Sequence, residues 1–157
     1  MRRFVSRRWA ARASVSFLVA AGIGLTALAG SGDQTPAADR PFIVECYYRA
    51  RWGHADEFIR LYRKNHLPVL KSLIQKGRIL KLSCVKPRYH GTEGGRWDYR
   101  VTIVYKDAAV AHDPSVEEVV KKQLFPDQST FKKEESRRFE VLSAHWDLPV
   151  EDVNLDE

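Results

Sequence analysis

The fold is decided by residues 42–76, which read FIVECYYRARWGHADEFIRLYRKNHLPVLKSLIQK. Residues 42–49 place more apolar side chains on one side of an extended chain than on the other, which predicts a strand with one buried face. Trp52-Gly53-His54 breaks this strand. Residues 55–76 then show apolar or aromatic side chains at steps of three or four, so we expect a helix that packs against the strand.

Pro68 interrupts the backbone hydrogen bonds of this helix because proline has no N–H. We therefore expect a kink or a restart of the helix near residues 65–67. Gly77 follows the last residue of the helical period, and we expect the helix to end there because glycine is the common residue just past a helix end.

The rest of the chain predicts three further strands and a second helical region. Residues 78–89 and 96–106 alternate in polarity and are joined by a glycine-rich turn, which predicts a hairpin. A helical region begins at Asp113, and a more polar helix follows over residues 128–140. Residues 144–150 predict the last strand, whose Pro149 favours a sheet edge.

The polar helix over residues 128–140 has few apolar side chains to bury. We expect Phe131 and Phe139 to be its inward anchors. Glu134 and Arg138 are four residues apart, a spacing at which opposite charges pair on a helix. Beyond the last strand, residues 151–157 form an acidic tail.

The element order is β-α-β-β-α-β, which is the split βαβ arrangement. It predicts an α+β, ferredoxin-like fold in which an antiparallel sheet carries its helices on one face. We assign this domain to residues 41–150.

A short first strand, a glycine turn, Asp56-Glu57-Phe58 and the downstream His66-x-Pro68 resemble the dimeric α+β barrel superfamily, and especially its EthD-like and NIPSNAP-like branches. The resemblance covers residues 42–150. It implies that two chains pack their sheets into a barrel as a homodimer and that a small ligand binds between helices and sheet. A monomeric ferredoxin-like domain without a ligand is the alternative.

Residues 1–29 have the layout of a secretory signal peptide. An arginine-rich start is followed by an apolar body over 17–29, and Ala27-Leu28-Ala29 is typical of a cleavage site before Gly30. An uncleaved anchor helix is the alternative. Residues 6–12 resemble the twin-arginine export motif but lack its Phe-Leu pair, so export by either route stays open.

The basic composition comes largely from this first segment. The chain has a net charge of +6, but without the five arginines of residues 1–29 there remain 21 basic against 20 acidic residues. The exported chain therefore has no general preference for nucleic acid, and we expect no stable membrane association after cleavage. Residues 30–40 predict a flexible linker, and the compartment is periplasmic or extracellular.

Cys46 and Cys84 lie in an oxidising compartment, which would favour a disulfide. In a ferredoxin-like sheet, however, the third strand separates the first from the second, so the two cysteines lie about 10 Å apart. A disulfide needs Cα atoms within about 7 Å. We predict two buried, reduced cysteines on the face that packs against the helices.

His66 is the candidate catalytic residue, as a general base or a ligand anchor. A purely structural role, in which it satisfies a carbonyl freed by Pro68, is the alternative. Aromatic side chains near it are expected to shape the ligand pocket, although such rings also form ordinary cores. These expected ligand-binding residues are Tyr48, Phe58, Tyr62, Trp97, Tyr99 and His112.

Trp97 and His112 also resemble the haem-degrading branch of the superfamily, which combines a strand tryptophan with a helix histidine. That branch also has an asparagine in its first strand, where this chain offers Glu45 and Tyr47. Because this asparagine is missing, haem binding or degradation is the third of the functional hypotheses. We assign no cofactor and no metal.

The preferred function is binding of a small, largely apolar ligand in the helix–sheet cleft, with a cofactor-independent oxygenase or isomerase as the possible activity. The alternative is a non-catalytic dimeric module. Signature motifs of serine hydrolases, dinucleotide-binding proteins, P-loop proteins and zinc proteases are absent from the sequence.

Overall fold

Strand β1 (Phe42–Ala50) lies inside a four-stranded antiparallel sheet in the computed structural model, which describes residues 40–89 and 91–156. The expected signal peptide and all of the expected linker except Arg40 lie outside the described residues. Among the described residues, no helix is long and apolar enough to cross a membrane.

The strand order is β2-β3-β1-β4, with β2 at Ile79–Val85, β3 at Tyr99–Tyr105 and β4 at Leu142–Val150. Strand β3 therefore separates β1 from β2, as the sequence predicts. Cys46 and Cys84 both pair with Val101, one from each side, and both are free thiols. The prediction that they form no disulfide is confirmed.

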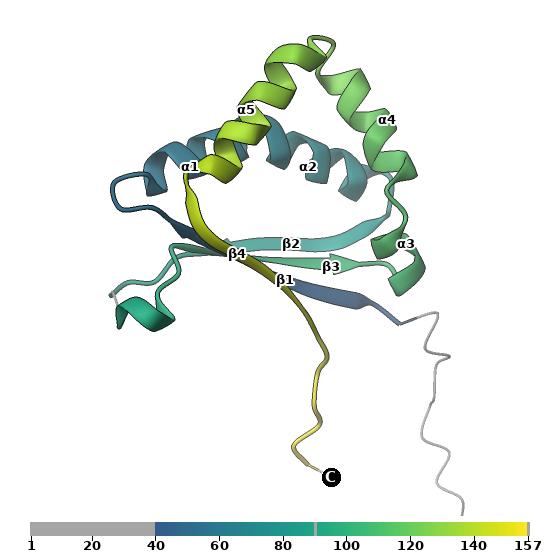
Figure 1. Ribbon diagram of the computed structural model, residues 1–157. Coiled ribbons are helices and arrows are strands. Elements are labelled where there is room, and N and C mark those ends of the chain that lie inside the picture. The colour runs from purple at the N-terminus through teal and green to yellow at the C-terminus, as the bar shows by residue number, and fades with distance from the viewer. Residues whose placement is uncertain (1–39, 90, 157) are drawn as a thin grey trace, which may run out of the picture. The chain divides into compact units, whose positions relative to one another are not determined.

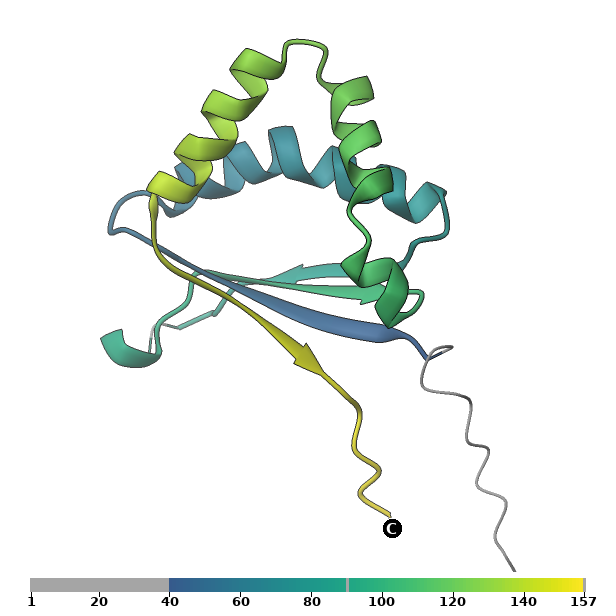
Figure 2. The ribbon, with the colours of Figure 1, turned by 45° about the vertical axis from the view of Figure 1, so that its right-hand side comes forward.

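The α-helices and the π-helix lie on one face of the sheet (Figures 1 and 2). The first helical stretch consists of α1 (Ala55–Leu61), the π-helix η2 (Tyr62–His66) and α2 (Leu67–Gln75). The second half contributes α3 (Ala108–His112), α4 (Ser115–Leu124) and α5 (Gln128–Glu140). A short 3-10 turn, η3 (Glu93–Gly95), lies in the β2–β3 connection. The ferredoxin-like α+β fold is confirmed.

Gly77 ends α2 as the sequence predicts. Its φ is +69°, a left-handed conformation that favours glycine. The N–H of Gly77 donates to the carbonyl of Ile74, and the N–H of Arg78 donates to that of Leu73. These two bonds form a Schellman motif, which satisfies the last helix carbonyls and turns the chain into β2.

The core lies between the sheet and the first helical stretch. Alternate residues of β1 and β3 face it, beginning with Cys46 and Tyr48 and their partners Val101 and Tyr99. Phe58 of α1 is fully buried against them. The other buried members of this cluster are Ala50, Tyr62, Leu70, Leu73, Ile79, Ile103, Val141 and Leu142.

The opposite face of the sheet is covered by no described helix. It carries a mixture of rings and charges: Tyr47 stacks on Trp146 at 5.2 Å, and the Arg100 guanidinium pairs with the Glu45 carboxylate at 3.4 Å. The Nε atoms of Arg49 and Arg100 are buried and lack a hydrogen-bond partner among the described residues. An unpaired buried polar group costs about 1–3 kcal/mol, so this face is incompletely satisfied in a single copy.

Two expectations about burial are wrong. Cys84 is exposed, because it lies on the edge strand β2 where the helices leave a recess. Phe139 is 49% exposed, while Arg138 is buried. Two helical turns span about seven residues, so Arg138 shares the inward face of Phe131 and Phe139 does not.

Phe58→Ala should lower the free energy of unfolding by about 3–5 kcal/mol, because the ring is fully buried and its removal leaves a cavity. Phe139→Ala is the matched control, with an expected loss under about 1 kcal/mol. Urea unfolding followed by circular dichroism measures both changes. Equal losses for the two variants would contradict the described packing.

Candidate functional site

The helix irregularity expected near residues 65–67 is a π-turn, after which the α-helix restarts at Leu67. The N–H of Leu67 donates to the carbonyl of Tyr62, an i to i+5 bond, and Pro68 follows in the first turn of α2. A π-turn inserts one extra residue into the helix, and such turns are frequent at functional sites. It brings Tyr62 and His66 together, with ring centroids 5.0 Å apart.

Four of the expected pocket residues form one aromatic cluster beneath this turn. The ring centroids of Tyr48 and Phe58 lie 4.8 Å apart, and that of Tyr99 lies 5.8 Å from Phe58. Tyr62 contacts both Tyr48 and Phe58 at 5.8 and 5.9 Å. Tyr48 and Phe58 are buried and form a packed base, and Tyr62, which is also buried, lies at the edge of this base.

A recess of about 230 Å³ opens on the β2 side of this cluster. Tyr62 is the aromatic residue that borders it. Its hydroxyl is buried and has no hydrogen-bond partner among the described residues. Burial raises the pKa of Tyr62, so the phenol keeps its proton and can donate it in a hydrogen bond. The other lining residues are Ile59, Arg63, Leu67, Leu82, Ser83, Cys84 and Val101.

His66 does not line this recess. Burial, and secondly the positive charge of Arg138, lower the pKa of His66 to about 4. The imidazole is therefore neutral at pH 7 and is a weak proton acceptor. Its described ring contact is with Tyr62, so its direct effect is on the orientation of that phenol.

Arg138 lies beside Tyr62 and was not among the expected site residues, since the sequence predicts only that it pairs with Glu134. It is 3% exposed and forms two hydrogen bonds with the Glu135 carboxylate, at 3.0 and 2.7 Å. Its guanidinium lies 5.8 Å from the Tyr62 ring. Glu134, its expected partner, instead accepts hydrogen bonds from Lys64 and from the buried Asn65 of η2.

His145 was also missed as a neighbour of the cluster. Its ring stacks on Tyr48 with centroids 4.4 Å apart, and its Nδ1 lies 2.9 Å from the carbonyl oxygen of Tyr47. The alternation of β4 could have placed it, because positions 145 and 147 face the helices when Trp146 faces away. Tyr48 beneath it has a pKa raised chiefly by burial.

Trp97 and His112 lie away from the cluster. Trp97 contacts Tyr47 at 5.7 Å on the uncovered face, because regular pairing in β3 begins only at Tyr99. His112 packs on Phe42 at 5.2 Å, and its Nδ1 lies 2.7 Å from the Ala108 carbonyl oxygen. The structure therefore does not bring these two residues together as the haem reading requires.

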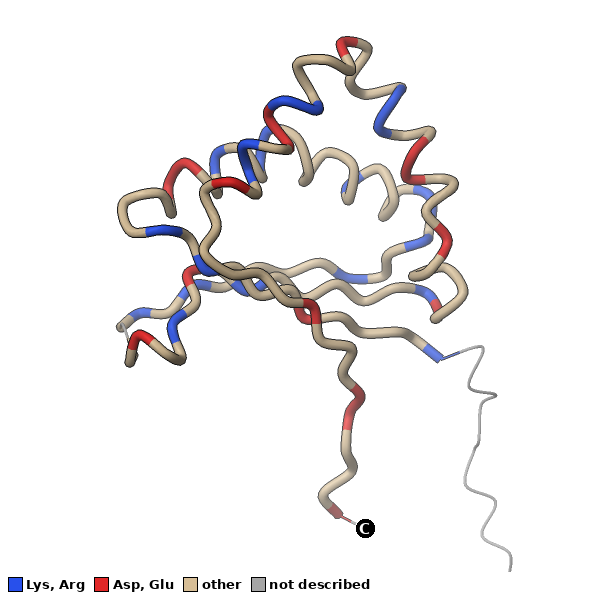
Figure 3. The backbone as a smooth tube through the Cα atoms, in the orientation of Figure 1, with Lys and Arg blue, Asp and Glu red and all other residues tan. Residues whose placement is uncertain are grey.

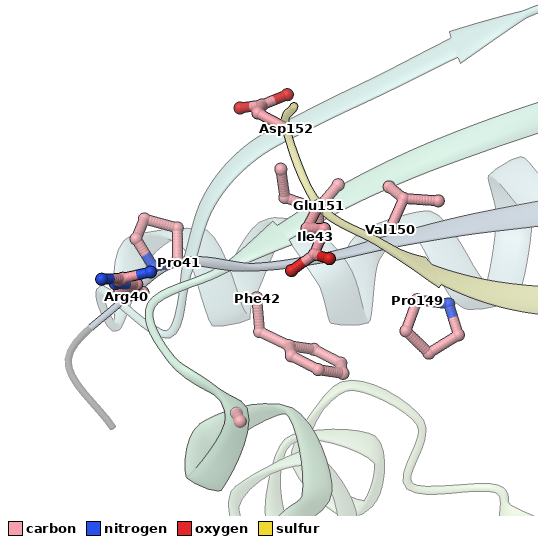
Figure 4. A pocket seen from close by; sticks show the side chains of 9 residues that line it. Arg40, Pro41, Phe42, Ile43, Pro149, Val150, Glu151 and Asp152 are labelled. Carbon is pink, nitrogen blue, oxygen red and sulfur yellow. The ribbon is translucent and has the colours of Figure 1, made fainter. Parts of the chain in front are cut away.

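A larger hollow of about 650 Å³ lies where β1 begins and β4 ends (Figure 4). It is lined by two chain segments, residues 40–43 and 149–152, with Ala108. None of the buried, unpartnered polar atoms of the described residues lies there. It offers less for specific recognition than the recess beside Tyr62.

The described residues contain no group of three or more histidines, cysteines, aspartates or glutamates placed to hold a metal ion. At the recess the available groups are the Tyr62 phenol, the Ser83 hydroxyl, the Cys84 thiol and the guanidinium of Arg63. Partial desolvation raises the pKa of the Cys84 thiol as well, so its sulfur is a neutral thiol at pH 7. These groups can bind and orient a ligand, but none is an activated nucleophile.

Fold and site together define a ferredoxin-like α+β protein with a small recess between helix and sheet. The chain is similar to a dimeric ferredoxin-like protein from an uncultured marine organism, with a TM-score of 0.50, 9% identity and coverage of 76% of this chain and 96% of that one. This similarity confirms the fold resemblance.

Further solved structures are similar at lower scores. A NIPSNAP domain protein from Burkholderia xenovorans has a TM-score of 0.45, 13% identity and coverage of 73% of this chain and 96% of its own. A putative antibiotic biosynthesis monooxygenase from Bacteroides thetaiotaomicron has a TM-score of 0.43, 10% identity and coverage of 74% and 93%. No protein-family model and no curated protein matches the chain.

The half-buried, neutral His66 makes stability depend on pH. Its folded pKa is about 4 against an ordinary 6.5, so the unfolded chain binds a proton first as pH falls. Its contribution is full above pH 6.5 and is lost as pH falls towards 4, by roughly 2–3 kcal/mol. His66→Gln should flatten this part of the stability–pH curve in urea unfolding. The exposed control His112→Gln should leave it unchanged, and equal curves for both variants would contradict the assignment.

Proposed function

We propose that the protein binds a small, largely apolar ligand carrying one hydrogen-bond acceptor in the recess beside Tyr62. The observation that carries this proposal is that Tyr62 borders this largely apolar recess while its buried hydroxyl has no partner among the described residues. A buried donor without an acceptor is costly, and an oxygen of a ligand would satisfy it.

The size of the recess supports a small ligand. Its volume of about 230 Å³ lies below the ~300–1,000 Å³ typical of sites for drug-sized molecules. The apolar body of the ligand would contact the aliphatic side chains of Ile59, Leu67, Leu82 and Val101. The positively charged guanidinium of Arg63 also lines the recess. A small ketone, ester or phenol combines an apolar body with an oxygen that can accept the hydrogen bond.

Binding is better supported than catalysis. An oxygenase or isomerase needs a group that moves a proton or activates oxygen. Near the recess, Tyr62 and Cys84 keep their protons, and His66 is a weak base that does not line it. The supported chemistry is a hydrogen bond from Tyr62 to a carbonyl or enol oxygen, which would hold such a substrate as well as a bound ligand.

We also propose that the protein is a homodimer in which the uncovered sheet faces of two copies pack together. The stacked rings of Tyr47 and Trp146 and the two unsatisfied arginine Nε atoms support this proposal, because a second copy would shield the rings and supply acceptors. We further propose that the protein is exported to the periplasm or the medium, because residues 1–29 have the layout of a signal peptide.

The ligand proposal can be tested with acetophenone, an apolar aromatic ketone with one acceptor oxygen. Titration followed by amide chemical shifts should perturb residues 59–67 and 82–84 and saturate. Tyr62→Phe should weaken binding about tenfold, the value of one hydrogen bond of about 1.4 kcal/mol. Cys84→Phe should fill the recess and abolish binding.

The control for the filling variant is Ile74→Phe, an exposed position of α2 outside the recess. It should bind like the unsubstituted protein. Unchanged affinity in both Tyr62→Phe and Cys84→Phe would refute the recess as the site.

Trp146→Asp should dissociate the dimer, since it removes a stacked ring and places a charge on the proposed interface. Sedimentation velocity should show a single-copy species for this variant. Val119→Asp, on an exposed position of α4, should remain dimeric. A dimer that survives Trp146→Asp would contradict the proposed interface.

A further inference from the structure

The connection between β2 and β3 forms a hollow of about 330 Å³ together with Trp52. Trp52 and Tyr89 are 73% and 86% exposed. The Arg96 guanidinium lies 4.4 Å over the Trp52 ring and is itself held by the Asp98 carboxylate and the Ala50 carbonyl. Arg96 therefore holds the Trp52 indole in one orientation, with an apolar surface facing solvent.

The C-terminal segment 151–156 combines exposed apolar side chains with carboxylates, which suits a hollow of aromatic rings near basic side chains. It leaves the sheet on the side opposite the helices, the same side on which η3 and its loop lie (Figures 1 and 2). Val153 and Leu155 are 73% and 90% exposed. Carboxylates accompany them at positions 151, 152 and 156.

The segment cannot reach the hollow of its own chain. Val150 pairs with Ile43 at one end of β1, whereas the hollow adjoins Ala50 at the other end, about 23 Å away at 3.3 Å per residue. From Val150 to Leu155 an extended chain spans at most about 17 Å. A second copy can bring this segment to such a hollow without that full extension.

Charge selects the orientation of the second copy. When the sheets face each other across a two-fold axis perpendicular to the strands, the C-terminal end of one copy lies over the loop end of the other. A two-fold axis parallel to the strands would instead bring the two acidic segments together. Figure 3 shows acidic residues along the C-terminal segment and residues of both signs in the loop. The loop carboxylates Glu93 and Asp98 pair with Arg96, whereas Lys86 and Arg88 are exposed and form no ion pair with any described residue. Opposite charges favour the first arrangement.

We infer that residues 151–156 of each copy bind the aromatic hollow of its partner, with Val153 and Leu155 against Trp52 and Tyr89 and the carboxylates near Lys86 and Arg88. The inference rests on the proposed dimer and adds two symmetric contacts at its ends. The chain would thus cover its own exposed rings by exchanging segments between copies.

Photo-cross-linking of the full chain tests this contact. Val153→p-benzoylphenylalanine should cross-link to Trp52 or to residues 86–98 on irradiation. In an equal mixture of nitrogen-15-labelled and unlabelled chains, a share of the products should join a labelled to an unlabelled peptide, which proves that the two peptides come from different copies. The same photo-reactive residue at the exposed Lys132 of α5 is the control and should give no such product.

Shortening the chain to end at Val150 should raise the dimer dissociation constant at least tenfold in sedimentation equilibrium. Arg88→Glu should weaken the dimer, and adding Asp152→Lys to it should restore the affinity. A dimer with unchanged affinity after shortening, or cross-links within one chain or to other segments, would overturn the inference and leave the sheet-to-sheet dimer standing. A full chain that stays monomeric would overturn both.

Discussion

A four-stranded sheet covered by helices on one face only is the constraint on which the rest of the structure depends. The covered face buries Tyr48, Phe58 and Tyr62, and this apolar contact fixes the first helical stretch over β1 and β3. The other face carries Glu45, Arg100 and a stacked aromatic pair, with polar nitrogens left unsatisfied. The first face accounts for the stability of a single copy, and the second favours association.

The π-turn connects the packed face to the proposed site. Because one extra residue is inserted between Tyr62 and Leu67, Tyr62 can be part of the aromatic base and still border the recess towards β2. His66 and the buried Arg138 surround the same ring from the helix side. The phenol is thus held in place by rings and a cation while its hydroxyl lacks a partner, which is the property expected of a preorganised donor.

The fold could be predicted from the sequence because the alternation of β1 and the helical period after Gly53 agree with each other. The position of Trp97 could not, since the alternation of residues 96–106 continues through a segment where Asp98 leaves the pattern to bind Arg96 and the Ala50 N–H. Arg138 was misplaced for a related reason. Pattern analysis expects an apolar residue inward, and only the structure shows that Glu135 neutralises a buried guanidinium.

The central claim is that a second copy covers the open face of the sheet. An isotope-filtered NMR experiment on an equal mixture of carbon-13-labelled and unlabelled chains tests it most directly. The account predicts nuclear Overhauser effects between copies at the side chains of Tyr47, Arg100 and Trp146. Contacts between copies that involve only α4 and α5, or none at millimolar concentration, would contradict it.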